Sequence, residues 1–152
     1  MTLPPRSGWL IAAAAASAAL VVLHFGIIVG GAPAYAWFLA PKNLVDLAKE
    51  HSLVPTLVTG GLAAVFTVFA ALALAGAGFY RLPGDRLAVL VIGCIYTLRG
   101  ALIVPEAIMV HFMNRPVRAL VFAGVSFAIG LLHLIGVARR WQLLAQPQSA
   151  DN

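Results

Sequence analysis

Apolar residues fill four long runs of this chain, and short polar segments separate the runs. The runs cover about residues 9–31, 53–78, 87–108 and 117–138. Each reaches or exceeds the roughly 20 residues that an α-helix needs to cross the hydrocarbon core of a bilayer. Because the runs are continuous, they do not fit the alternating pattern of β-barrel strands. The sequence therefore predicts an all-α fold, an integral membrane four-helix bundle with up-down-up-down topology and a single transmembrane domain.

The segments between and beyond the runs predict turns and interfacial structure. Residues 79–85 contain Leu-Pro-Gly-Asp, a combination typical of tight turns, so the second and third spans should be antiparallel neighbours. Residues 32–52 mix aromatic and charged side chains, which favour the membrane surface, and we expect a short surface helix at residues 43–50. Residues 142–152 are predicted to form a mobile tail.

The first run also has features of a signal peptide, because Ala34-Tyr35-Ala36 looks like a cleavage site. The apolar region of a signal peptide spans only about 7–15 residues, however, and this run is longer. We therefore expect the first run to remain as a transmembrane helix. Within it, Gly26 and Gly30 offer a close-packing face of the Gly-x-x-x-Gly type.

Composition supports a membrane location. The 152 residues are 62% hydrophobic and 10% charged, whereas soluble domains have roughly 45–50% apolar residues. A net charge of +5 would suggest a nucleic-acid partner in a soluble protein, but here the basic residues lie singly or in pairs at the ends of the apolar runs. They are typical of membrane-surface anchors, so we expect membrane lipid, and not nucleic acid, as a partner.

Four spans place both termini on one side of the membrane. The basic residues of that side are Arg6, Arg81, Arg86, Arg139 and Arg140, and those of the opposite side are Lys42, Lys49, Arg115 and Arg118. This small excess favours both termini in the cytoplasm. In general outline the chain resembles small four-helix proteins of bacterial inner membranes, including those of the DoxX type, which implies a multi-pass inner-membrane location and carries no activity over.

Sequence motifs of familiar enzyme classes are missing from the chain: Gly-x-Ser-x-Gly, His-Glu-x-x-His and a phosphate-binding glycine loop do not occur. Cys94 is the one cysteine, so the paired cysteines of vitamin K epoxide reductase-like and DsbB-like enzymes are absent. His24 and His133 lie at depths that differ by about 14 Å along their helices, which argues against a haem held by both. No cofactor is expected, and whether the protein is an enzyme stays open.

The third run carries an arginine in its middle. A central Arg costs roughly 2.5–3.5 kcal/mol on insertion scales, and each surrounding Leu, Ile or Val returns roughly 0.3–0.6 kcal/mol. We therefore expect the helix to insert with Arg99 buried and turned away from lipid. Tyr96, Arg99 and Glu106 share one face of a helix with 3.6 residues per turn. Pro105 is expected to bend or end this helix near residue 108.

Polar residues of the other three runs fall at a similar depth to Arg99, about 20 Å from the side that holds the termini. We predict that they line a water-accessible cavity that binds a ligand. The predicted ligand-binding residues are Arg99, Glu106, His24, Tyr96, Thr59 and Ser126. In the alternative interpretation, helix carbonyls or a lipid phosphate satisfy Arg99, which then only fixes how the helices pack.

Met109, His111 and Met113 form a weak candidate metal site after the third run. Thioether and imidazole ligands suit monovalent copper. An extended segment would place all three side chains on one side, whereas a continuing helix would separate His111 from the two methionines.

Three classes of function follow from these patterns. The leading interpretation is a small polytopic membrane protein that binds or transports a small amphipathic or anionic ligand in a polar cleft around Arg99. The second is an accessory or assembly subunit, in which the face of Gly26 and Gly30 meets a partner membrane protein or a second copy. The third is a membrane-embedded lipid-modifying enzyme that uses His24 or Glu106 as a proton carrier.

Overall fold

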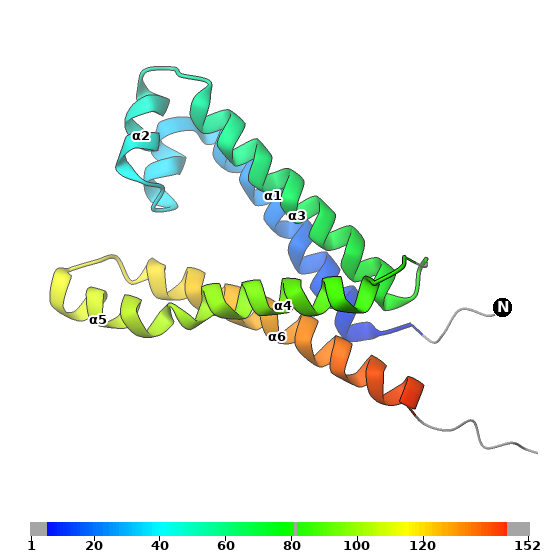
Figure 1. Ribbon diagram of the computed structural model, residues 1–152. Helices are drawn as coiled ribbons and strands as arrows, with labels where there is room; N and C mark the ends of the chain where they lie inside the picture. Colours follow the sequence, from blue (N-terminus) through cyan, green and yellow to red (C-terminus); the bar gives the residue numbers. More distant parts are fainter. Residues whose placement is uncertain (1–5, 81, 146–152) are drawn as a thin grey trace, which may run out of the picture. The chain divides into compact units, whose positions relative to one another are not determined.

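The computed structural model describes residues 6–80 and 82–145, without the side chains of residues 142–145. The helices, in chain order, are α1 (Gly8–Trp37), α2 (Lys42–Lys49), α3 (Val54–Ala77), α4 (Asp85–Ala101), α5 (Ile103–Met113) and α6 (Arg118–Ala145) (Figure 1). Within these residues, four segments are long and apolar enough to cross a membrane: Gly8–Trp37, Val54–Ala77, Asp85–Met113 and Arg118–Trp141. The predicted all-α class with four spans is confirmed, and the length and composition of the helices indicate a multi-pass membrane protein.

α1 extends beyond the predicted first span. Its backbone departs from helical geometry at Gly31, with φ 60° and ψ −152°, a conformation that glycine adopts without the penalty of a β-carbon. Pro33 follows, and proline is favoured in the first turn of a helix because its fixed φ suits that position. The helix therefore restarts after a kink and continues to Trp37, past the predicted end at residue 31.

The third apolar run is divided into α4 and α5 at Leu102. Pro105 causes this break, because proline has no N–H to donate to the carbonyl of Ala101 and its ring clashes with that carbonyl. The next amide recovers helical bonding, with the N–H of Glu106 donating to the carbonyl of Leu102 at 2.9 Å. The predicted bend is confirmed, but the predicted end near residue 108 is wrong, because α5 continues to Met113.

α6 also outlasts its predicted span. The predicted end at residue 138 is too early, since the helix continues to Ala145. Residues 139–145 contain good helix formers and neither glycine nor proline, so nothing local stops the helix there. Residues 142–145 of the predicted mobile tail are therefore helical, and residues 146–152 lie outside the described part of the chain.

The chain divides into two compact units. The first unit combines residues 1–14 with residues 71–152, and the second unit is residues 15–70. α1 and α3 thus contribute to both units, whereas α4, α5 and α6 belong to the first and α2 to the second. The prediction of a single transmembrane domain stays a prediction.

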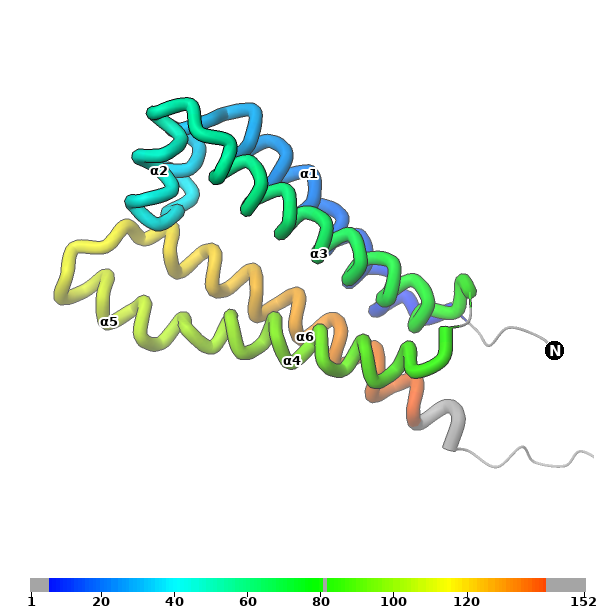
Figure 2. The backbone as a smooth tube through the Cα atoms, turned by 45° about the horizontal axis from the view of Figure 1, so that its top comes forward, coloured from blue at the N-terminus to red at the C-terminus, as the bar shows by residue number. Residues whose placement is uncertain are grey.

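The second unit has a small core at the end of α1, and the predicted short helix is confirmed there, while its position at the membrane surface stays a prediction. α2 lies beside the C-terminal end of α1 (Figure 2), and its Val45 is buried against Ile27 and Tyr35. On the exposed side of α2, Lys49 Nζ lies 3.1 Å from Asp46 Oδ1. α2 is therefore amphipathic, with one face packed on α1 and one polar face.

In the first unit, α4 and α6 run antiparallel in close contact (Figures 1 and 2). Glycines make this approach possible. A β-carbon on Gly100 would lie 2.5 Å from the Cα and backbone N of Phe127, and one on Gly130 would lie 2.6 Å from the backbone N of Thr97. Small residues let membrane helices approach until their backbones touch. This close packing matters because lipid tails are as apolar as the helix surface, so helices in a membrane associate mainly through van der Waals contact.

A second cluster ties α1 and α3 to this pair. Leu10 is fully buried together with Ala77, Val89 and Val137, which come from α3, α4 and α6. Leu10 also fills the space beside Gly136, where an added β-carbon would lie 2.5 Å from Leu10 Cδ2. The first turn of α1 is therefore fixed against the C-terminal half of α6.

Candidate functional site

The structure does not bury Arg99. Arg99 lies in the last turn of α4 and is exposed, and we find no hydrogen bond or ion pair from it to the described part of the chain. The prediction of a buried Arg99 is therefore wrong. The physical reason is the rotation of α4, which directs Tyr96 and Gly100 at α6 and leaves the intervening Arg99 on another face.

Glu106 does not share a cleft with Arg99. The two residues lie on either side of the break at Leu102, Arg99 in α4 and Glu106 in α5. Glu106 instead lies 3.5 Å from the Arg115 guanidinium, measured from Oε2 to Nη1. This ion pair connects α5 with the segment that precedes α6.

Tyr96 and Ser126 are structural within the first unit. Tyr96 is buried and stacks on His133, which is fully buried on α6, with 5.5 Å between ring centroids. His133 Nδ1 donates to the carbonyl of Ile129 at 2.9 Å, and the Ser126 hydroxyl donates to the carbonyl of Phe122 at 3.0 Å. Both bonds lie within α6, and the other ring nitrogen of His133, Nε2, is buried without a hydrogen-bond partner among the described residues.

His24 and Thr59 belong to the second unit. His24 Nδ1 donates to the carbonyl of Leu20 at 2.6 Å, and its ring lies 4.9 Å from the ring of Phe66 on α3. Thr59 is buried in α3. His24 is therefore a hydrogen-bonded residue in the contact between α1 and α3.

The weak metal candidate lies on a helix. Met109, His111 and Met113 all fall within α5. Met109 and Met113 are four residues apart and share a face, whereas His111 is turned roughly 200° from Met109 around the helix. This is the arrangement that separates the imidazole from the two thioethers, and the three residues do not converge on one point.

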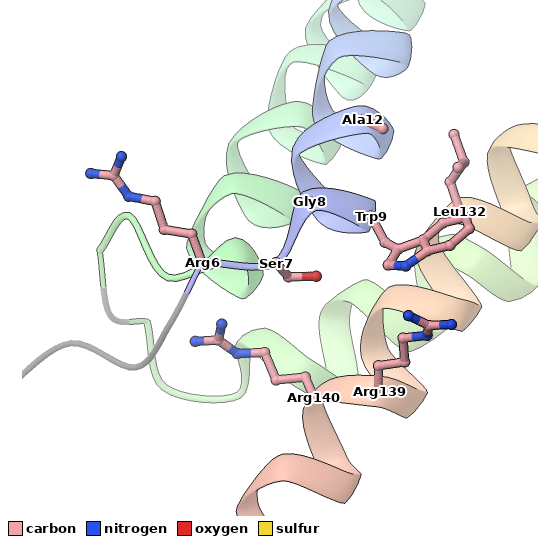
Figure 3. A pocket seen from close by; sticks show the side chains of 8 residues that line it. All are labelled: Arg6, Ser7, Gly8, Trp9, Ala12, Leu132, Arg139 and Arg140. Carbon is pink, nitrogen blue, oxygen red and sulfur yellow. The ribbon is translucent and has the colours of Figure 1, made fainter.

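A pocket of about 480 Å³ opens instead between the start of α1 and the C-terminal half of α6, inside the first unit (Figure 3). Its lining residues are Arg6, Ser7, Gly8, Trp9, Ala12, Leu132, Arg139 and Arg140. We call this the arginine pocket. Its volume falls within the roughly 300–1,000 Å³ that is usual for small-molecule sites.

The contact of Leu10 with Gly136 brings together the two helices that line the arginine pocket. Gly136 lies one turn before Arg139 and Arg140, and a β-carbon there would meet Leu10 and, at 3.3 Å, Trp9 Cβ. The bare backbone of α6 thus lets the first turn of α1 approach closely. Residues from both ends of the chain are thereby brought around one opening.

Two arginines of the pocket are placed by aromatic rings. The Arg139 guanidinium carbon lies 5.3 Å from the centre of the Trp9 ring, and that of Arg6 lies 4.4 Å from the centre of the Phe79 ring. Both distances are within the roughly 6 Å at which a cation is attracted to a ring face. Trp9 therefore holds Arg139 at the pocket wall.

Arg140 differs from the other two because it is 9% exposed, whereas Arg6 and Arg139 are exposed. Asp85, at the start of α4, attracts the Arg140 charge, and Arg86 repels it. Burial of a charge is costly unless other charges or hydrogen bonds compensate it. With Asp85 balancing one charge, the surroundings of the pocket keep an excess of positive charge.

The start of α1 adds to this electrostatic character. The carbonyl of Ser7 accepts the first helical bond from the N–H of Ile11 at 3.1 Å, and the N–H of Ser7 donates to the carbonyl of Ala77 at 3.1 Å. The first amides of a helix have no partner within the helix and carry a partial positive charge. Gly8 and Trp9 hold these amides at the pocket, beside the Ser7 hydroxyl, which Figure 3 shows directed toward the space between Arg139 and Arg140.

The arginine pocket was not predicted as a site. Arg6, Arg139 and Arg140 were interpreted as membrane-surface anchors because each stands at the end of an apolar run. The one local signal is the pair Arg139-Arg140 followed by Trp141. Comparison with protein-family models, with curated proteins and with solved structures finds no match to this chain, so its family is not assigned.

Proposed function

We propose that this protein binds a small anionic amphipathic molecule, with the anionic group in the arginine pocket. The observation that carries the proposal is the lining itself: three arginines and, among the described lining residues, no acidic side chain. This moves the proposed ligand site from Arg99, which is exposed, to the end of the helices.

The pocket combines a cationic end with an apolar wall. Arg139 and Leu132 are seven residues apart on α6 and share a face, so the wall runs roughly 10 Å along the helix from charge to apolar surface. Trp9 and Ala12 form the corresponding wall on α1, one turn apart. A molecule with an anionic head and a hydrocarbon tail matches both parts.

Arg140 distinguishes this site from ordinary surface anchoring. Anchoring arginines extend their side chains to the headgroups and keep them solvated, whereas Arg140 is 9% exposed. An anion in the pocket would be attracted by Arg140 as well as by Arg6 and Arg139, which is the physical reason for ligand binding here.

We also propose a bacterial inner-membrane location with both termini in the cytoplasm. Arg6, Arg86, Arg139 and Arg140 would then face the cytoplasmic leaflet, whose anionic lipids attract basic residues near the surface. In this orientation the arginine pocket lies at the headgroup level of the leaflet that is richer in anionic lipid.

A binding experiment tests the proposed function. The protein, with Trp37→Phe and Trp141→Phe to leave Trp9 as the one tryptophan, is placed in nanodiscs of phosphatidylcholine with increasing amounts of an anionic lipid, and Trp9 fluorescence is followed. We expect saturable binding that weakens at least tenfold with Arg139→Gln and Arg140→Gln together. Arg99→Gln is the matched control and should bind like the parent. Loss of binding with Arg99→Gln, but not with the pocket variant, would return the site to the middle of α4.

An accessory role in a membrane complex is the second proposal. A β-carbon on Gly26 would meet nothing within 4 Å, so this face of α1 has open space for a partner helix or a second copy. Native mass spectrometry of the gently purified protein separates the two proposals, because a retained lipid and a retained protein give different mass shifts.

A further inference from the structure

We infer that the arginine pocket selects a phosphate monoester, a doubly charged headgroup, on a hydrocarbon tail. This inference rests on the proposed function and specifies the chemistry of its ligand. It follows from the number of charges around the pocket, from the kind of cation that carries them and from the direction in which the pocket extends.

The charge balance favours a dianion. Arg6, Arg139 and Arg140 line the pocket, and Asp85 opposes one of these charges. The amides at the start of α1 add a further partial positive charge, equivalent to roughly half an elementary charge. A headgroup with one negative charge would leave most of this excess uncompensated, whereas a phosphate monoester carries about two charges at neutral pH.

Guanidinium groups also suit phosphate oxygens better than a point charge would. Arginine donates several N–H bonds in a planar fork that matches two oxygens of a phosphate. Arg139 and Arg140 are adjacent on α6 and diverge by about 100° around the helix, and Figure 3 shows their side chains on either side of the opening, with the Ser7 hydroxyl between them. A terminal phosphate has three unesterified oxygens, so one can accept from Arg139 while another accepts from the Ser7 hydroxyl. A phosphodiester has only two.

The apolar wall indicates that the phosphate belongs to a lipid. Ala12 and Leu132 line the pocket one and two turns inside the spans, where a soluble phosphate gains nothing. A lipid tail can lie against this wall while its phosphate stays at the arginines, and the contact adds van der Waals packing. A free phosphate compound shares the headgroup chemistry but lacks this contribution.

The site predicts a pH dependence that comes from the ligand. Arginines stay protonated at all working pH values. Asp85 and Arg86 act on the charge of Arg140, Arg6 and Arg139 line the same pocket, and no histidine is among its described lining residues. A phosphate monoester loses its second charge as the pH falls below its second pKa of about 6. Selectivity for the monoester should therefore be high at pH 8 and be largely lost at pH 5.

The test compares phosphatidic acid, a monoester, with phosphatidylglycerol, a diester of one charge, in phosphatidylcholine nanodiscs with Trp9 as the one tryptophan. At pH 8 we expect phosphatidic acid to bind at least tenfold more tightly, and at pH 5 less than threefold more tightly. Inorganic phosphate and glycerol phosphate, added to the discs that contain phosphatidic acid, should not displace it at millimolar concentration. Effective competition by either would overturn the lipid assignment and indicate a soluble phosphate ligand.

Two variants separate this inference from the proposed function. Arg139→Gln alters an exposed residue and should reduce the preference for phosphatidic acid while the protein stays folded by circular dichroism. Asp85→Asn removes the competing carboxylate and should tighten binding of both lipids. If both lipids bind equally at pH 8 and both are lost with Arg139→Gln and Arg140→Gln, monoester selection is wrong and the proposed function stands. If neither lipid responds to the arginine variants, the proposed function itself is wrong.

Discussion

Leu10 of α1 occupies the space that a side chain at Gly136 of α6 would need. A β-carbon on Gly136 would lie 2.5 Å from Leu10 Cδ2 and 2.6 Å from Leu10 Cγ. Leu10 is fully buried and touches buried residues of three other helices, so it has no free space to move into. This single contact fixes the distance between the two helices that form the arginine pocket.

Gly136→Ala is therefore expected to destabilise the protein, although alanine is the better helix former. Overpacking a filled core costs about 1–3 kcal/mol, and the melting temperature in detergent should fall accordingly. Binding of the anionic lipid should weaken as well, because α1 must move away from α6. Leu10→Ala in the same chain removes the clash, so the double variant should be less destabilised than the sum of the two single changes. Simple additivity would contradict the contact.

The contact of α4 with α6 gives a second prediction. Gly100→Ala would bring a β-carbon within 2.5 Å of the backbone of Phe127, which cannot rotate away as a side chain can. We expect a larger fall in melting temperature than for Gly136→Ala. Gly124→Ala is the matched control on α6, because the nearest atom to its β-carbon would lie at an ordinary 4.0 Å. Equal effects of Gly100→Ala and Gly124→Ala would show that the two helices do not pack this closely.

Arg99 and Arg140 should respond in opposite ways to loss of charge. Arg99→Leu replaces an exposed charge within a span, so membrane insertion should improve and the melting temperature should not fall. Arg140→Leu removes a buried partner of Asp85 and should lower the melting temperature. Glycosylation-based insertion assays and thermal unfolding in detergent measure the two effects. A fall with Arg99→Leu as large as that with Arg140→Leu would restore the prediction of a buried Arg99.

The proposed orientation is tested by single cysteines at Lys49 and Ser149 in a Cys94→Ala background. An impermeant thiol reagent applied to intact cells should label Lys49→Cys, because this residue is exposed and the proposed topology puts it on the side opposite the termini. Ser149→Cys should label only after the cells are broken. The reverse pattern would invert the topology and place the arginine pocket in the outer leaflet.

Local chemistry of the sequence determined the spans, the surface helix and the bend at Pro105. Hydropathy is a sum over neighbouring residues, so four runs longer than a bilayer predict four spanning helices whatever their partners are. The missing N–H of Pro105 likewise acts on a carbonyl four residues away. Helix ends were predicted less well, because Gly31 with Pro33 permits a restart and no residue between 139 and 145 stops α6.

Only the tertiary structure decided which polar residues meet. One helix face would hold Tyr96, Arg99 and Glu106, as their spacing predicts, if the helix were unbroken. What that face contacts depends on how α4 is rotated about its axis. The close packing of Gly100 and Gly130 sets this rotation and leaves Arg99 exposed. Arg6 and Arg139 are 133 positions apart in sequence, 139 minus 6, and they line one pocket because Leu10 fits against Gly136. Such contacts depend on shape complementarity between distant segments, which periodicity within a single run does not encode.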